Sequence, residues 1–200
     1  MRRRIAYLLP VAALAVLGLA LGATAQSGGK GKGKRARTVA QASLKSSDGR
    51  GVGKVRLLER RNGKVRVVVR ARGLEPGFHG FHVHEKGLCE PPAFSSAGGH
   101  HKRDGQTHGG HAGDMPPLLA TGDGKARAAF VTDFFRINEL VEGDGSAIMI
   151  HAGRDNLANI PGRYASGTTT GPDEETLKTG DSGGRSACGV VQLKRRRPGG

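Results

Sequence analysis

Seven of the eight histidines in this chain lie within 35 residues, from Gly77 to His111, and this density constrains the fold more than any other feature. Neutral imidazole is the commonest metal ligand among side chains. The stretch therefore predicts a metal site, with the rest of the chain as its scaffold. The eighth histidine, His151, lies forty residues further along the chain.

The segments around this stretch alternate between apolar and polar side chains, which is typical of β-strands. Asn62-Gly63, between two such segments, indicates a tight hairpin. Residues 89–118 and 155–186 lack periodicity and are expected to be long loops, and 134–142 a loop or a single helical turn. We expect an all-β sandwich or barrel with eight strands, near 39–44, 52–58, 64–71, 78–84, 118–121, 125–132, 147–151 and 188–193.

His82 and His84 stand two positions apart on an expected strand, so both rings face the same side. Such a pair also occurs by chance on a protein surface, and alone it does not establish a metal site. Three more histidines and one aspartate lie within fifteen residues, a ligand set that suits a tetrahedral zinc ion: His100, His108, His111 and Asp114. His82, His84 and His151 remain for a second ion, and three imidazoles with an open position suit copper or zinc.

The N-terminus has the pattern of a secretory signal peptide at residues 1–25. Three arginines precede an apolar run from Ile5 to Leu21, and Ala23-Thr24-Ala25 matches a signal peptidase site. We expect cleavage after Ala25. A retained membrane anchor is the alternative, but the run contains Pro10 and is short for a membrane span.

The chain is therefore expected to be exported, to the periplasm, the cell envelope or the exterior. In an oxidising compartment Cys89 and Cys188, the only two cysteines, are expected to form one disulfide rather than two free thiols. A bridge that closes a loop of about 100 residues stabilises a fold by about 4 to 5 kcal/mol in the chain-entropy model.

The net charge of +15 belongs mainly to the ends of the chain. Residues 26–37 and 194–197 hold nine Lys and Arg and no acidic residue, whereas 38–193 hold 20 Lys and Arg against 17 Asp and Glu, a net charge of +3. We expect a disordered basic linker at 26–37 and a basic tail at 194–200. Both suit contact with an anionic cell envelope, with inert linkers as the alternative. Their lack of aromatic residues argues against nucleic-acid binding.

Five motifs, in order along the chain, resemble those of exported bacterial copper/zinc superoxide dismutases. They are Gly77–His84, Ser96–His100, His108–Asp114, His151–Asn156 and Thr179–Gly189. The resemblance covers about residues 40–192 and implies a domain at 38–193 with the family's eight-stranded Greek-key β-barrel, an immunoglobulin-like sandwich. It also implies the dismutation of superoxide to dioxygen and hydrogen peroxide, with one copper and one zinc per chain.

The resemblance also implies a role for each matching residue. The positions that match copper ligands are His82, His84, His100 and His151. The positions that match zinc ligands are His100, His108, His111 and Asp114. His100 thus matches a bridging imidazolate that passes a proton to peroxide, Asp155 a carboxylate that links a copper histidine to a zinc histidine, and Arg185 a guanidinium that guides the anion. Cys89 and Cys188 match the family's disulfide.

Three neighbouring residues are interpreted without a metal role: His79 as a structural histidine, His101 as exposed, and Met115 as loop packing. Only two glycines separate His108 from His111, fewer residues than in many relatives, and this is expected to lower zinc affinity. His101-Lys102-Arg103 adds positive charge that is expected to steer superoxide inward.

Two other functions fit the sequence. One is a copper- and zinc-binding or copper-delivery protein of the same fold that does not catalyse dismutation, and the other is a polybasic envelope-binding protein with an inactive barrel. Retention of His100, Asp155 and Arg185 counts against the first. The sequence shows no interface pattern that indicates an oligomeric state.

Overall fold

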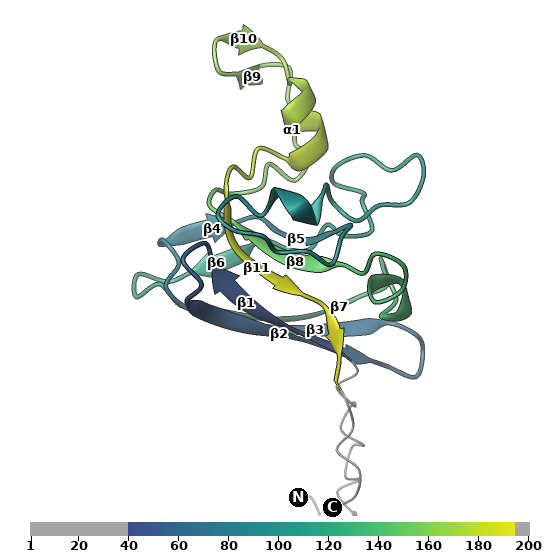
Figure 1. Ribbon diagram of the computed structural model, residues 1–200. Helices are drawn as coiled ribbons and strands as arrows, with labels where there is room; N and C mark the ends of the chain where they lie inside the picture. The colour runs from purple at the N-terminus through teal and green to yellow at the C-terminus, as the bar shows by residue number, and fades with distance from the viewer. Residues whose placement is uncertain (1–39, 195–200) are drawn as a thin grey trace, which may run out of the picture. The chain divides into compact units, whose positions relative to one another are not determined.

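The computed structural model describes residues 40–194 of the chain (Figure 1). The predicted signal peptide, the basic linker and residues 195–200 of the basic tail lie outside the described residues. Within the described range, no helix combines the length and the apolar character that a membrane span requires.

The described chain is almost entirely β-structure. Ten strands form one sheet: β1 (Ala40–Ser46), β2 (Gly51–Glu59), β3 (Val65–Ala71), β4 (Gly77–His79), β5 (Phe81–His84), β6 (Leu118–Ala120), β7 (Ala126–Thr132), β8 (Ala147–His151), β11 (Arg185–Val190) and β12 (Gln192–Leu193). The remaining elements are the hairpin β9 (Ala165–Ser166) and β10 (Thr169–Thr170), helix α1 (Glu174–Thr179), and the 3-10 turns η1 (Ser95–Ala97) and η2 (Asn138–Leu140).

The sheet curls into a nearly closed barrel whose two end strands meet at Gly80. Its strand order is β4-β6-β7-β3-β2-β1-β11-β8-β5, so the two end strands are consecutive in the chain and only Gly80 separates them. A side chain at Gly80 would overlap Ser182, since its Cβ would lie 2.3 Å from the Ser182 Oγ atom. The pairs β3–β7 and β1–β11 join strands that are distant in sequence, which is the Greek-key pattern. The predicted Greek-key β-barrel with two long loops is confirmed.

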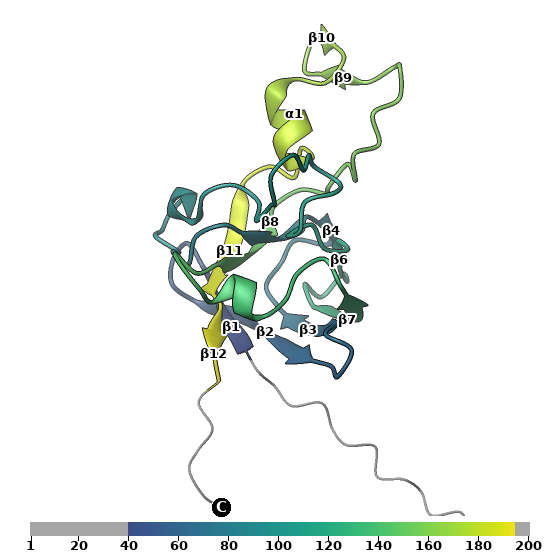
Figure 2. The same cartoon turned by 90° about the vertical axis from the view of Figure 1, so that its right-hand side faces the viewer.

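Two of the eight expected strands are divided in the structure. The expected strand 78–84 splits because β4 pairs with β6, whereas β5 pairs with β8. The last strand begins at Arg185, earlier than expected, and splits into β11 and β12. The expected loop 155–186 contains β9, β10 and α1, which lie together beyond one side of the barrel in both views (Figures 1 and 2).

Strand β5 is buried on both faces. Phe81 and Val83 point into the apolar core of the barrel, which valines of β3 and isoleucines of β8 also fill. His82 and His84 point outward, as the alternation predicts, but they are also buried, with 0% and 1% exposure. The long loop after β5 therefore covers the outer face of this strand.

Backbone hydrogen bonds hold this loop against β5. The amide of Val83 donates to the Gly113 carbonyl over 2.9 Å, and the Val83 carbonyl accepts from His101 over 2.8 Å. Phe94 and Ala97 pack on Met149 and Cys188 in a second apolar cluster outside the barrel. A disulfide between Cys89 and Cys188 ties the start of the loop to β11. The loop is thus ordered by strand pairing, apolar packing and a covalent bond.

Candidate metal centre

Two groups of potential ligands lie on the outer face of the barrel and share one histidine. Within each group the candidate donor atoms lie within 4.8 Å of one another. The first group contains four imidazoles: His82, His84, His100 and His151. The second contains three imidazoles and one carboxylate: His100, His108, His111 and Asp114. The structure therefore brings together all seven residues that the sequence singled out as ligands.

Backbone carbonyls orient the rings of His84 and His151. The Nδ1 atom of His84 donates to the Gly98 carbonyl over 2.9 Å, and that of His151 to the Gly183 carbonyl over 3.1 Å. These bonds fix the tautomer of each ring and leave both Nε2 atoms free to bind a metal. The two Nε2 atoms face each other at 3.3 Å.

Asp155 connects the two groups. Its Oδ2 atom accepts from His82 Nε2 over 2.5 Å, and its Oδ1 atom accepts from His108 Nε2 over 2.8 Å. The pKa of Asp155 lies well below its usual value: burial raises it, but the hydrogen bonds with His108 and His82 outweigh burial. Each of the two histidines thereby turns its Nδ1 atom toward the ligand group to which it belongs.

Three buried ring nitrogens have no hydrogen-bond partner: His82 Nδ1, His100 Nε2 and His108 Nδ1. A buried polar atom without a partner is costly, and in native proteins it usually has an explanation such as a bound ion. Each of these rings has its other nitrogen hydrogen-bonded to a carboxylate. The donor set therefore fits two metal ions, one held by imidazoles alone and one by imidazoles and a carboxylate.

Asp114 organises the short loop of the second group. Its Oδ1 atom accepts from His100 Nδ1 over 2.9 Å, and its Oδ2 atom accepts from the amides of Gly109 and His111 over 2.7 and 3.1 Å. Burial raises the pKa of Asp114, but hydrogen bonds with His100 and His111 outweigh burial and hold the pKa well below its usual value. Despite its two-glycine spacing, this loop brings both of its histidines to the carboxylate.

The protonation of the free rings differs between the two groups. Burial lowers the pKa of His100 to about 4 and that of His151 to about 3, and it also lowers the pKa of His84. For His108, burial also acts to lower the pKa, but the hydrogen bond and charge of Asp155 and the charge of Asp114 outweigh it and raise the pKa above 6.5.

If the all-imidazole group holds copper and the other group zinc, as the resemblance implies, zinc is expected to leave at a higher pH than copper. Protons compete with a metal once the pH falls through the pKa of a free ligand. For His108, whose pKa is raised, this begins at a higher pH than for an ordinary histidine, whereas for His151 it begins only near pH 3. Metal content after dialysis at stepwise lower pH measures both losses. Release of copper before zinc would contradict the expectation.

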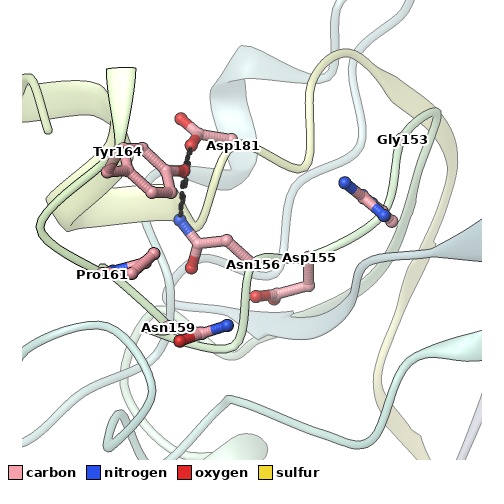
Figure 3. A pocket seen from close by; sticks show the side chains of 8 residues that line it. Gly153, Asp155, Asn156, Asn159, Pro161, Tyr164 and Asp181 are labelled. Carbon is pink, nitrogen blue, oxygen red and sulfur yellow. Dashed lines mark hydrogen bonds between the residues drawn. The ribbon is translucent and has the colours of Figure 1, made fainter. Parts of the chain in front are cut away.

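Replacing Asp155 by Asn is expected to weaken metal binding by about 10- to 100-fold, because an amide oxygen cannot accept from both histidine rings. Competition with a chelator measures the affinities. Asp181→Asn is the matched control, since Asp181 lies in the same region but accepts from Tyr164 and Asn156 rather than from a histidine (Figure 3). Equal losses of metal affinity in the two variants would show that Asp155 does not act by connecting the two histidines.

Arg185 lies beside the shared histidine at a channel of about 600 Å³. Its guanidinium donates to the Phe94 carbonyl over 2.5 Å and to the Gly98 carbonyl over 2.7 Å. Gly98 is also the acceptor for His84, so one carbonyl fixes both side chains. Lys102 from the loop and residues of α1 line the same channel. The sequence did not predict this helix, whose residues at the channel are Glu174, Glu175, Leu177, Lys178 and Thr179.

The segment after Asp155 folds back on itself (Figure 3). The Asn156 amide donates to the Tyr164 hydroxyl over 3.0 Å, and that hydroxyl donates to Asp181. These contacts join the start of the segment to its end and line a cleft of about 650 Å³ next to Asp155. The amide of Leu157 also donates to Asp155 Oδ1 over 2.6 Å. The segment therefore holds the carboxylate that connects the two groups.

The three neighbouring residues without a predicted metal role lie outside both groups. The ring nitrogens of His79 each lie 2.7 Å from a backbone carbonyl, those of His151 and Glu75. Met115 packs in the barrel core rather than within the loop. His101 is half-buried, so the expectation that it is exposed is wrong. The backbone pairing of His101 with β5 explains the difference.

A Greek-key barrel whose outer face carries two ligand groups joined by one imidazole defines a class of proteins with a two-metal centre. A family model described as copper/zinc superoxide dismutase (SODC) matches residues 52–191. The chain belongs to this family. It is an oxidoreductase that dismutates superoxide, and its cofactors are copper and zinc.

Individual relatives and solved structures also match this chain, and they point to the same family. The Cu-Zn superoxide dismutase of Mycobacterium tuberculosis is 43% identical over 165 residues, which cover 75% of this chain and 68% of that protein. That of Escherichia coli K12 is 32% identical over 194 residues, covering 90% and 97%. The crystal structure of a SOD-like protein from Bacillus subtilis matches with a TM-score of 0.59 at 29% identity, covering 75% of this chain and 96% of that chain.

Proposed function

We propose that superoxide reacts beside His100 and Arg185, with copper held by the all-imidazole group and zinc by the group that contains Asp114. The observation that carries this proposal is the position of His100, the residue that belongs to both groups. Its Nδ1 atom faces Asp114 at 2.9 Å, while its Nε2 atom is buried without a hydrogen-bond partner. One ring thus joins a redox ligand set to a carboxylate-containing set.

When bound, copper would supply the one-electron redox chemistry that dismutation requires, and zinc would be held by His100, His108, His111 and Asp114. The residues of this chain supply the rest. His100 Nε2 takes up one proton in one half of the cycle and gives it to the peroxide in the other, where solvent supplies the second proton, with Asp114 holding the ring in place. His82, His84 and His151 keep their orientation throughout, because Asp155 and two backbone carbonyls hold their outer nitrogens.

Arg185 attracts the superoxide anion and orients it. Its side chain is half-buried, and its two hydrogen bonds to carbonyls leave the guanidinium charge without an acidic partner in the described part of the chain. Lys102 adds positive charge at the channel, while Glu174 and Glu175 of α1 add negative charge. A cation inside a channel raises the local concentration of a small anion, and salt weakens this effect.

Arg185→Ala is expected to lower kcat/KM for superoxide by roughly tenfold and to flatten its dependence on salt. Arg185→Lys keeps the charge and should retain most of the salt dependence. Pulse-generated superoxide decay measured over a range of salt concentrations gives both quantities. Metal content is measured in parallel, because Arg185 also holds Gly98. A loss of rate with unchanged salt dependence would show that Arg185 acts only on loop structure.

Metal analysis of the purified protein together with superoxide decay tests the whole proposal. We expect one copper and one zinc per chain and a rapid decay of superoxide. Two bound metals without activity would favour the alternative, a copper/zinc-binding or copper-delivery protein. Zinc without copper would contradict the assignment of the first group.

We also propose that the chain is exported and that its basic ends contact the anionic cell envelope. Support comes from the signal-like N-terminus, the concentration of Lys and Arg outside 38–193, and the disulfide. Fractionation of cells that express the full chain tests both parts. Activity in the cytosolic fraction alone would contradict export, and surface retention that high salt does not release would contradict electrostatic contact.

A further inference from the structure

Three positively charged side chains stand directly opposite one another across three neighbouring strands. The register pairs Lys54 of β2 with Arg70 of β3, and Arg70 with Arg127 of β7. All three are exposed on the outer face of the barrel. The next position in the row, on β1, is Ser43, so the row contains no acidic residue. We name these three residues the cationic row.

The positive charges of the cationic row are not balanced by an acidic residue within the row. Like charges directly opposite on neighbouring strands destabilise a sheet. Several other exposed cations of the described chain have acidic partners, for example Arg50 with Asp48 and Lys64 with Asp133. No residue of the cationic row takes part in a salt bridge within the described range. Alternating positive and negative side chains at these three positions would keep the surface polar without this repulsion.

The cationic row lines a groove rather than a flat surface. Arg72, directly after β3, and Lys125, directly before β7, also line this groove of about 540 Å³. Lys125 also pairs with Asp123 at 2.6 Å, the one acidic contact among these five cations. Glycines and small or β-branched residues form the remainder, and no aromatic side chain lines the groove. Five cations therefore converge on a recess with space for an anionic group.

The groove lies away from the metal centre. In the strand order of the sheet, β1 and β11 separate β2 from β8 on one side, and β6 and β4 separate β7 from β5 on the other. Figure 1 shows β2, β3 and β7 on the side of the barrel opposite to β5, β8 and α1. A ligand in the groove would leave the channel beside Arg185 open.

We propose that this groove binds a linear polyanion that carries repeated phosphate groups. Guanidinium groups match phosphate oxygens in a bidentate geometry, and Lys is also a common phosphate ligand. The absence of aromatic residues disfavours single-stranded nucleic acid, which requires surfaces for base stacking. A recessed row favours a chain that enters the groove over a lipid surface, which would contact protruding residues. Binding there would hold the enzyme on an anionic polymer while its catalytic face stays free.

Binding of inorganic polyphosphate to the metal-loaded full chain tests the proposal. The variant is Arg70→Glu, which places a carboxylate between Lys54 and Arg127 and is therefore expected to fold. The control is Arg163→Glu, which changes the net charge equally at an exposed residue outside the groove. We expect the dissociation constant for polyphosphate to rise at least about tenfold for Arg70→Glu and less than about twofold for the control. For Arg70→Glu, the slope of log affinity against log salt concentration should fall by an amount that corresponds to about one or two lost phosphate contacts.

A second measurement separates binding from fold stability. Without ligand, Arg70→Glu should melt at a higher temperature than the unchanged chain, because the repulsion in the row is removed. Polyphosphate should raise the melting temperature of the unchanged chain and of the control, but not that of Arg70→Glu. Equal losses of binding in the two variants would overturn the proposal in favour of net charge or the chain ends. Tighter groove-dependent binding to anionic vesicles or to single-stranded DNA would also overturn it.

Discussion

Replacement of His100 by Ala is expected to lower the rate of superoxide decay by about 100- to 10,000-fold, the range typical for loss of a positioned acid–base group. The reason is geometric, since His100 is the one residue common to both ligand groups. Its loss removes the proton from the channel and breaks the connection between the two sites. The measurement is superoxide decay by the variant, with copper and zinc content determined on the same sample.

His101→Ala is the matched control, because it removes a neighbouring half-buried imidazole that belongs to neither group. It should keep both metals and nearly all of the activity. Metal analysis distinguishes the two possible origins of a loss in His100→Ala. An unchanged rate with both metals bound would exclude proton transfer by His100, and a loss that disappears when copper is restored would assign His100 a binding role only.

Removal of the disulfide by Cys89→Ser together with Cys188→Ala is expected to lower the free energy of unfolding by about 4 kcal/mol. The bond closes a loop of 99 residues, and loop closure restricts the unfolded chain. Alanine suits position 188, because this residue is buried beside Phe94 and Met149 in an apolar cluster. Denaturant unfolding of the metal-free protein measures the difference.

A reducing agent provides the control for this variant. It should destabilise the unchanged chain by a similar amount and leave the double variant unaffected. The variant should also bind copper less tightly, since the loop that follows Cys89 supplies the carbonyls that hold Arg185 and His84. Unchanged stability in both experiments would mean that strand pairing and packing order the loop without the bond.

The sequence predicted the strands well because their alternation is a local signal. The eight expected segments all occur, and His82 and His84 lie opposite to Phe81 and Val83 as period two requires. The division at Gly80 depends on a change of partner from β6 to β8, which no local pattern encodes. Helix α1 has a readable N-cap at Asp173 and a left-handed Gly180 at its end, but six residues give too little periodicity to predict a helix.

The candidate ligands were predictable because histidine is rare and its spacing is informative. The atoms that orient these ligands were harder to predict. Asp155 came from the resemblance to a family, whereas the Gly98 and Gly183 carbonyls are backbone atoms that any residue could supply. The sequence predicted residues 89–118 only as a long loop. The pairing of this loop with the edge of β5 is a long-range contact without a sequence signal. The cationic row likewise exists only through the register of three strands.

The meeting of the two end strands at Gly80 has a consequence for resistance to irreversible inactivation. His82 and His84 lie on β5, the end strand that begins directly after Gly80, and they share one ligand group with His151 of β8 and His100 of the covering loop. A bound ion would therefore tie this end of the sheet to both neighbours. A ligand that binds only the folded state raises its stability in proportion to the logarithm of free ligand over its dissociation constant. The time that the protein survives at high temperature should therefore follow its metal occupancy, and depletion of metal by a chelator would shorten its life as well as stop its turnover.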